Sequence, residues 1–88
     1  MTTVQTTSAN RHRQLNREAR RATRAIAANF RRTARAQGTS VLTLRKTAQV
    51  TPWRMLWLWT GVHMMITDMF RVQYALDMSV EDVFEGTR

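Results

Sequence analysis

Arginine side chains dominate the chemistry available to this sequence. Thirteen of its 14 basic residues are Arg, against six acidic residues, and the net charge is +8. A guanidinium presents a planar set of donors that matches phosphate oxygens and the O6 and N7 acceptors of guanine. Residues 1–54 carry 12 basic residues and one acid, a balance of +11, whereas residues 55–88 have a balance of −3. This distribution indicates that the N-terminal half binds a polyanion; the alternative is a solvated face that only favours solubility.

The segment from Leu44 to Gly61 has the residues expected of two short helices joined by a three-residue turn. Thr51 is a good N-cap residue, and Pro52 suits the first helical position because its φ is preset and it has no N–H to leave unpaired. Two helices joined in this way are typical of a helix-turn-helix DNA reader, here over about residues 40–61. Arg54 would then reach either a guanine edge or a phosphate.

Helical periodicity extends over most of the chain, and no alternating pattern predicts a strand. Residues 1–9 are predicted to be a disordered arm and residues 10–88 a single domain. Helices are expected over about 10–37, 41–49, 52–60 and 68–76, with Ser40 and Thr67 as N-caps of the second and fourth. Ser79 opens a short last helix, with Val83 and Phe84 packed inward. The apolar stripe of the first helix consists of Leu15, Ala19, Ala22, Ile26, Phe30 and Ala34.

Several classes of function lack the residues that they need. The chain has no Cys and only two His, so neither a disulfide nor a zinc site is expected. No arrangement of nucleophile and base, Gly-rich phosphate loop or pair of carboxylates predicts an enzyme, a cofactor or a small-molecule ligand. The apolar segment between Arg54 and Asp68 is shorter than the about 20 residues of a membrane span. With no apolar signal sequence, a cytoplasmic protein is expected.

The joint spacing of these residues resembles the DNA-binding domain of phage Cro proteins and repressors, the lambda-repressor-like helix-turn-helix family. The resemblance covers about 55 residues, from Phe30 to Phe84. It rests on the following positions: Leu44, Val50, Thr51, Met55, Leu58 and Gly61 in the motif, and Met69, Val72, Leu76, Ser79, Val83 and Phe84 in the tail. The chain departs from the family pattern at Arg45, Gln49 and Gln73. Gln49 replaces the turn glycine, at a position that needs a left-handed backbone.

The resemblance implies an all-α, five-helix domain whose third helix enters the major groove of double-stranded DNA. The helical periodicity of residues 10–37 gives this domain a long basic N-terminal helix. The resemblance also implies that the recognition residues are Thr51, Pro52, Trp53, Arg54 and Trp57. Phosphates of the DNA backbone would be contacted by Ser40, Arg45, Lys46, Thr60, Arg31, Arg32 and Arg35. Related domains bind as dimers on paired half-sites, so a second copy is a candidate partner.

Two sets of residues keep alternative interpretations. Arg11, Arg13 and Arg17 either form an arm that follows the minor groove or are disordered. Trp53 and Trp57 share a helix face, which contacts thymine methyls and sugars or packs against the first helix or a second subunit.

The predicted function is a sequence-specific transcription regulator, a phage Cro-like protein or small repressor that binds double-stranded DNA. The Trp-rich helix also suits an antirepressor or an inhibitor of a host factor. The Arg-rich first helix also suits an architectural DNA binder without sequence preference or, less well because its stripe is mostly Ala, a helix lying on anionic lipid.

Overall fold

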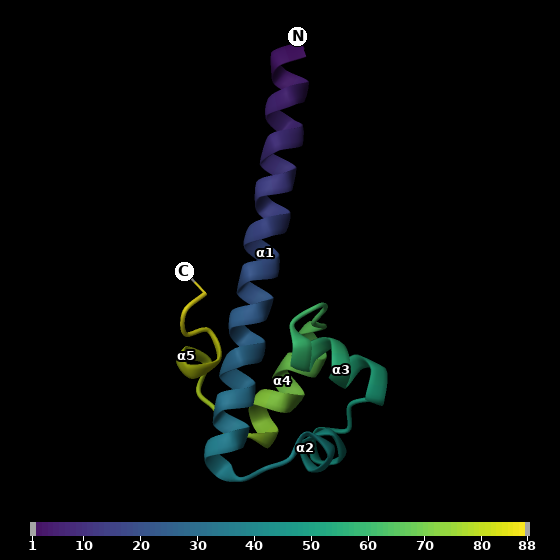
Figure 1. Cartoon of the computed structure of the whole chain (residues 1–88), viewed down its shortest axis with the longest axis vertical. Helices are drawn as coiled ribbons and strands as arrows, with labels where there is room; N and C mark the ends of the chain where they lie inside the picture. The colour runs from purple at the N-terminus through teal and green to yellow at the C-terminus, as the bar shows by residue number, and fades with distance from the viewer. Residues whose placement is uncertain (1, 88) are drawn as a thin grey trace.

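The computed structural model describes the backbone of residues 2–87 and the side chains of residues 10–87. Within this range the chain forms five helices and no strand (Figure 1): α1 (Thr2–Gln37), α2 (Val41–Ala48), α3 (Pro52–Thr60), α4 (Ile66–Ala75) and α5 (Val80–Val83). The expected all-helical, five-helix chain is confirmed. The disordered arm predicted over residues 1–9 lies outside the fully described residues.

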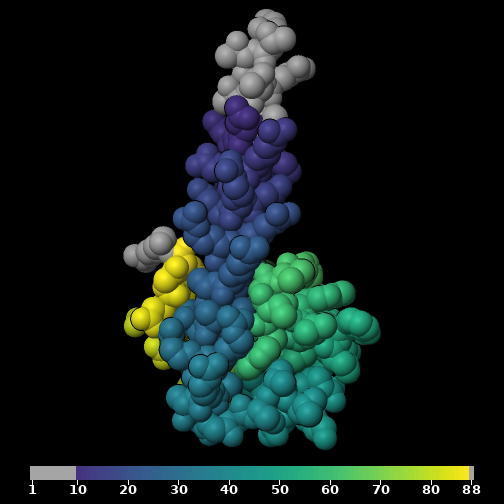
Figure 2. Space-filling view, viewed as in Figure 1, coloured from purple at the N-terminus to yellow at the C-terminus, as the bar shows by residue number. Residues whose placement is uncertain are grey.

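The helix α1 extends well beyond the part of the fold that packs against it (Figures 1 and 2). Every described side chain from Asn10 to Arg21 is exposed, and burial begins at Ala22. The inward stripe is therefore shorter than predicted, since Leu15 is 56% exposed whereas Ile26 and Phe30 are buried. Helical periodicity identifies a face of a helix, but it does not tell where along the helix its partners end.

The core lies beside the C-terminal half of α1. The helix α3 packs against α1, α2 packs against α4, and α5 covers another side of α1 (Figure 1). Each of the five helices contributes at least one large apolar side chain with less than 2% exposure, and the helical residues of this kind are Phe30, Leu44, Met55, Leu58, Val72 and Val83. Burial of such large apolar side chains is the main stabilising contribution in a chain of this size.

The helix ends test the predicted caps. The hydroxyls of Ser40 and Ser79 accept from the amides of Thr43 and Asp82, so these two N-caps are confirmed. Thr51 lies at the N-cap position of α3, but its hydroxyl makes no capping bond. Thr67 is not a cap, because the first turn of α4 closes earlier, through a bond from the Met69 amide to the Met65 carbonyl (2.9 Å).

The predicted inward packing of Phe84 is wrong. Val83 is fully buried, whereas Phe84 is 39% exposed. Consecutive residues of a helical turn point about 100° apart, so the small core beside α5 can take only one of these two side chains.

Asn29 fastens the C-terminal segment to α1. It is 4% exposed, and its amide donates to the carbonyls of Val83 (2.9 Å) and Glu85 (2.7 Å). We expect Asn29→Ala to lower the free energy of unfolding by about 2 kcal/mol, because both carbonyls lose their donor. Urea denaturation measures this loss. Asn16→Ala, an exposed position of the same helix, should lose nothing, and equal midpoints for the two variants would contradict the assigned role.

Candidate nucleic-acid interface

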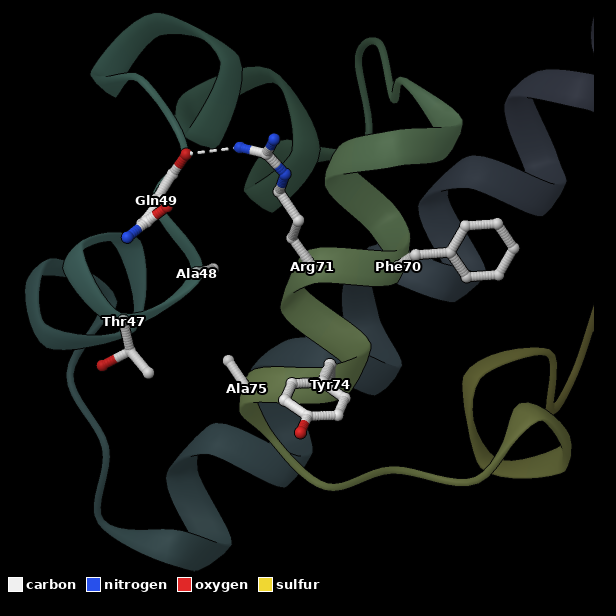
Figure 3. A pocket seen from close by; sticks show the side chains of 7 residues that line it. All are labelled: Thr47, Ala48, Gln49, Phe70, Arg71, Tyr74 and Ala75. Atoms are coloured by element: carbon white, nitrogen blue, oxygen red, sulfur yellow. Dashed lines mark hydrogen bonds between the residues drawn. The ribbon is translucent and has the colours of Figure 1, made fainter.

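The connection between α2 and α3 consists of Gln49, Val50 and Thr51. Gln49 has φ 57° and ψ 48°, the left-handed conformation expected at this position. Val50 is 2% exposed and fills the space between the two helices. Arg45 donates to the Val50 carbonyl (3.3 Å), and Arg71 of α4 donates to the Gln49 carbonyl (2.9 Å; Figure 3). These bonds hold the turn, and with it the placement of α3 relative to α2.

The helix α3 has a buried inner face and an uncovered outer face. Met55 and Leu58 point into the core. Trp53 is 69% exposed, Leu56 50% and Trp57 41%. Large apolar side chains gathered on one exposed face are a common feature of binding surfaces.

Neither Trp of the outer face is buried within this chain. The large exposed fraction of the Trp53 side chain excludes the predicted alternative in which this ring packs against α1. Trp57 contacts His63 edge to face, with ring centroids 5.9 Å apart, and keeps part of its ring exposed. Trp59 is half-buried against the core. Trp53 and Trp57 are therefore free to meet either DNA or a partner protein.

Arg54 points away from the outer face and pairs with Asp68 of α4. Its Nε donates to Asp68 Oδ2 (2.8 Å) and its Nη2 donates to Asp68 Oδ1. The Asp68 side chain is 1% exposed and that of Arg54 is 33% exposed. The hydrogen bond to Asp68 raises the pKa of Arg54 above its ordinary value, against the opposing effect of burial. The donor edge that would grip a guanine is therefore already engaged by a buried carboxylate.

The other polar side chains predicted to contact DNA around α2 and α3 fall into two groups. Lys46 and Thr51 are exposed, and the Thr51 hydroxyl makes no capping bond. The Thr60 hydroxyl bonds the Leu56 carbonyl (2.8 Å), Ser40 caps α2, and Arg45 braces the turn. The first two side chains are open to a ligand, whereas the other three also serve the fold.

The three predicted contacts on the C-terminal half of α1 do not form one surface. Arg31 donates to the Trp59 carbonyl (2.5 Å) and ties α1 to the end of α3. Arg32 faces the C-terminal segment, where it pairs with Glu85 (3.4 Å). Arg35 is exposed. The predicted track of phosphate contacts is therefore interrupted at Arg32, because Arg31 and Arg32 point about 100° apart.

The predicted minor-groove residues lie on the helix α1. Arg11, Arg13 and Arg17 are all exposed. Arg13 and Arg17 are four residues apart and share a face, whereas Arg11 lies on a different one. In the structure they are carried by a helix rather than by an extended chain.

Sequence reasoning missed the role of Arg71 in holding the turn. Arg71 also lines an open groove of about 540 Å³ between α2 and α4 (Figure 3), with Thr47, Ala48, Gln49, Phe70, Tyr74 and Ala75. One signal could have singled out this residue: it is the one basic residue in the otherwise acidic stretch 55–87.

Other kinds of site find no support in the described residues. No group of three or more metal-ligating side chains comes together among residues 10–87. None of the described helices combines the length and apolar content needed to cross a bilayer.

Comparison with known proteins does not assign a function to this chain, so the function is argued from the geometry of the site alone. No protein family, no curated protein and no solved structure matches this chain.

Proposed function

We propose that this chain is a sequence-specific double-stranded DNA-binding protein that regulates transcription, similar to phage Cro proteins and small repressors. In this proposal α2 and α3 form the helix-turn-helix, and α3 enters the major groove. The observation that carries it is the uncovered outer face of α3, held by a braced turn within a strongly basic chain. The width of the major groove admits one α-helix.

Phosphates would be held at the ends of the two helices. The Thr51 hydroxyl is exposed and without a capping bond at the start of α3, where free amides favour an anion. Lys46 is exposed near the end of α2 and would meet the neighbouring phosphates. These contacts set the register of α3 without reading sequence.

Base recognition in this proposal rests on apolar contacts. Because Arg54 is engaged by Asp68, the side chains left to face the bases are Trp53, Leu56 and Trp57. Apolar side chains in the major groove recognise the thymine methyl group. We therefore infer a preference for sites rich in thymine, bound by two copies on paired half-sites in the cytoplasm of a bacterial host.

A protein partner is the second candidate for the same surface. A mostly apolar groove of about 340 Å³ between α2 and α3 continues the outer face and is lined by Val41, Leu42, Arg45, Pro52, Met55, Leu56 and Trp59. An antirepressor or a host-factor inhibitor would use such a surface to take up an apolar side chain.

Selection of bound sequences from random duplexes, followed by mobility-shift titration, tests the first proposal. We expect a thymine-containing consensus and an affinity for it at least tenfold above that for a scrambled duplex. Trp53→Ala should weaken binding to the consensus by about 10- to 100-fold, at roughly 1–3 kcal/mol per specific contact. Tyr74→Ala, which removes a 90% exposed aromatic from α4, is the matched control and should bind normally. Equal binding to both duplexes would refute sequence reading.

A further inference from the structure

We propose that the free part of α1 is a second nucleic-acid contact, an arginine row that binds phosphates of the same duplex that α3 reads. The arginine row consists of Arg13, Arg17, Arg20 and Arg24. This inference rests on the proposed function, because it assigns a second contact to the DNA bound by α3.

The spacing of the arginine row places its members on one face of the helix. Successive members are four, three and four residues apart, the interval at which helical side chains are neighbours. All four are exposed. From first to last they span about 16 Å of helix at 1.5 Å per residue. Each strand of a duplex presents one phosphate per about 3.4 Å of its axis, so this length spans about five phosphates of one strand.

The charges of the arginine row have no counter-charge within the described residues. The two ion pairs found there join Arg54 to Asp68 and Arg32 to Glu85. The one acid of the segment, Glu18, accepts from Gln14 (3.4 Å). Like charges at these intervals repel one another along a helix. A bound polyanion would offset this repulsion.

The C-terminal end of α3 contacts α1 on the side of the arginine row. The Thr23 hydroxyl donates to the Gly61 carbonyl (2.9 Å), and Gly61 lies directly against the backbone of Arg24. Arg31, seven residues after Arg24 and thus on the same side, donates to the Trp59 carbonyl. The free part of α1 rises from this junction (Figures 1 and 2). The arginine row and α3 therefore border the same side of the molecule.

The width and the apolar content of the free part of α1 indicate which part of a polyanion it can contact. A helix is about 10–12 Å wide with its side chains, whereas the minor groove is about 6 Å wide, so this segment does not follow the minor groove as an extended arm does. The face opposite the arginine row offers Leu15 and Ala19, too little apolar surface to insert into a lipid layer. Phosphates bordering the major groove are the partner that fits.

The test replaces the arginine row in the full chain by Arg13→Gln, Arg17→Gln, Arg20→Gln and Arg24→Gln together. We expect binding to every duplex to weaken equally, with the slope of log K against log salt reduced by about three to four, because each phosphate contact contributes about 0.9. The ratio between consensus and scrambled duplexes should stay unchanged. Circular dichroism checks that the variant keeps its thermal midpoint, as exposed side chains predict.

Single replacements supply a matched pair. Arg17→Gln should lower the salt slope by about one, whereas Arg11→Gln, on a different face of the same free segment, should leave it unchanged. Equal salt slopes for Arg11→Gln and Arg17→Gln would contradict the proposal that the arginine row is the face of α1 that contacts phosphates.

The remaining outcomes separate the two proposals. If the variant with all four substitutions binds duplex with the wild-type slope of log K against log salt, the arginine row does not contact DNA. The proposed function would still stand. A wild type that binds no duplex at any salt concentration would refute both. Tighter binding of the wild type to phosphatidylglycerol vesicles than to duplex would overturn DNA as the partner of the row.

Discussion

Gly61→Ala is expected to lower the free energy of unfolding by about 3 kcal/mol, with about 1 from the positive φ and the rest from overpacking. Gly61 ends α3 with φ 79° and is buried. A methyl group there would lie 2.9 Å from the Arg24 Cα and 3.2 Å from the Thr23 carbonyl oxygen. Both contacts are with backbone, so α3 and α1 would have to move apart. Thermal denaturation should show a midpoint lowered by about 12–24 °C, at 4–8 °C per kcal/mol for a domain of this size.

Gly38→Ala is the control for Gly61. Gly38 also has a positive φ (68°), but a methyl group there meets nothing within 4 Å. Only the conformational cost applies, and we expect a loss of about 1 kcal/mol. Equal losses for the two variants would show that α3 and α1 are not in close contact at Gly61.

Arg54→Met is expected to destabilise the protein more than Asp68→Asn. The first change leaves a 1% exposed carboxylate without its partner, which is among the costliest changes in a protein interior. The second leaves a neutral amide, and Arg54, a third exposed, can turn its guanidinium to water. Thermal midpoints at neutral pH measure the order. A midpoint for Arg54→Met above that of Asp68→Asn would show that the pair does not hold α3 to α4.

The double variant Arg54→Met/Asp68→Leu separates stability from DNA recognition. Replacing both members of a buried ion pair with apolar residues is often neutral, so this variant should be more stable than Arg54→Met alone. If recognition rests on Trp53, Leu56 and Trp57, the double variant keeps its preference for the selected sequence. A variant that folds but loses preference at one guanine would assign base reading to Arg54.

Local signals predicted most of the helical arrangement. Ser40 and Ser79 cap their helices, and Gly61 ends α3 in the left-handed conformation. These predictions succeeded because capping depends on neighbouring backbone groups. The prediction for Thr67 failed because the loop before α4 is shorter than the sequence pattern suggests, and the chain is already helical at Ile66.

Properties that depend on packing were harder to predict. Leu15 belongs to the apolar stripe of α1, yet no other helix reaches it. Phe84 and Val83 are both apolar, but only Val83 is buried in the core. Periodicity describes one helix at a time, whereas burial depends on where the other helices end.

The sequence by itself determined the all-helical chain, the serine caps of α2 and α5 and the uneven charge, because these follow from local backbone chemistry and from composition. Only the tertiary structure decided what the candidate site offers. A long-range contact between α3 and α4 commits Arg54 to Asp68, and no local pattern shows which of many acids an arginine will meet. The same packing leaves Trp53 uncovered and the arginine row unpaired, so the surfaces open to a ligand were set by contacts between residues distant in sequence.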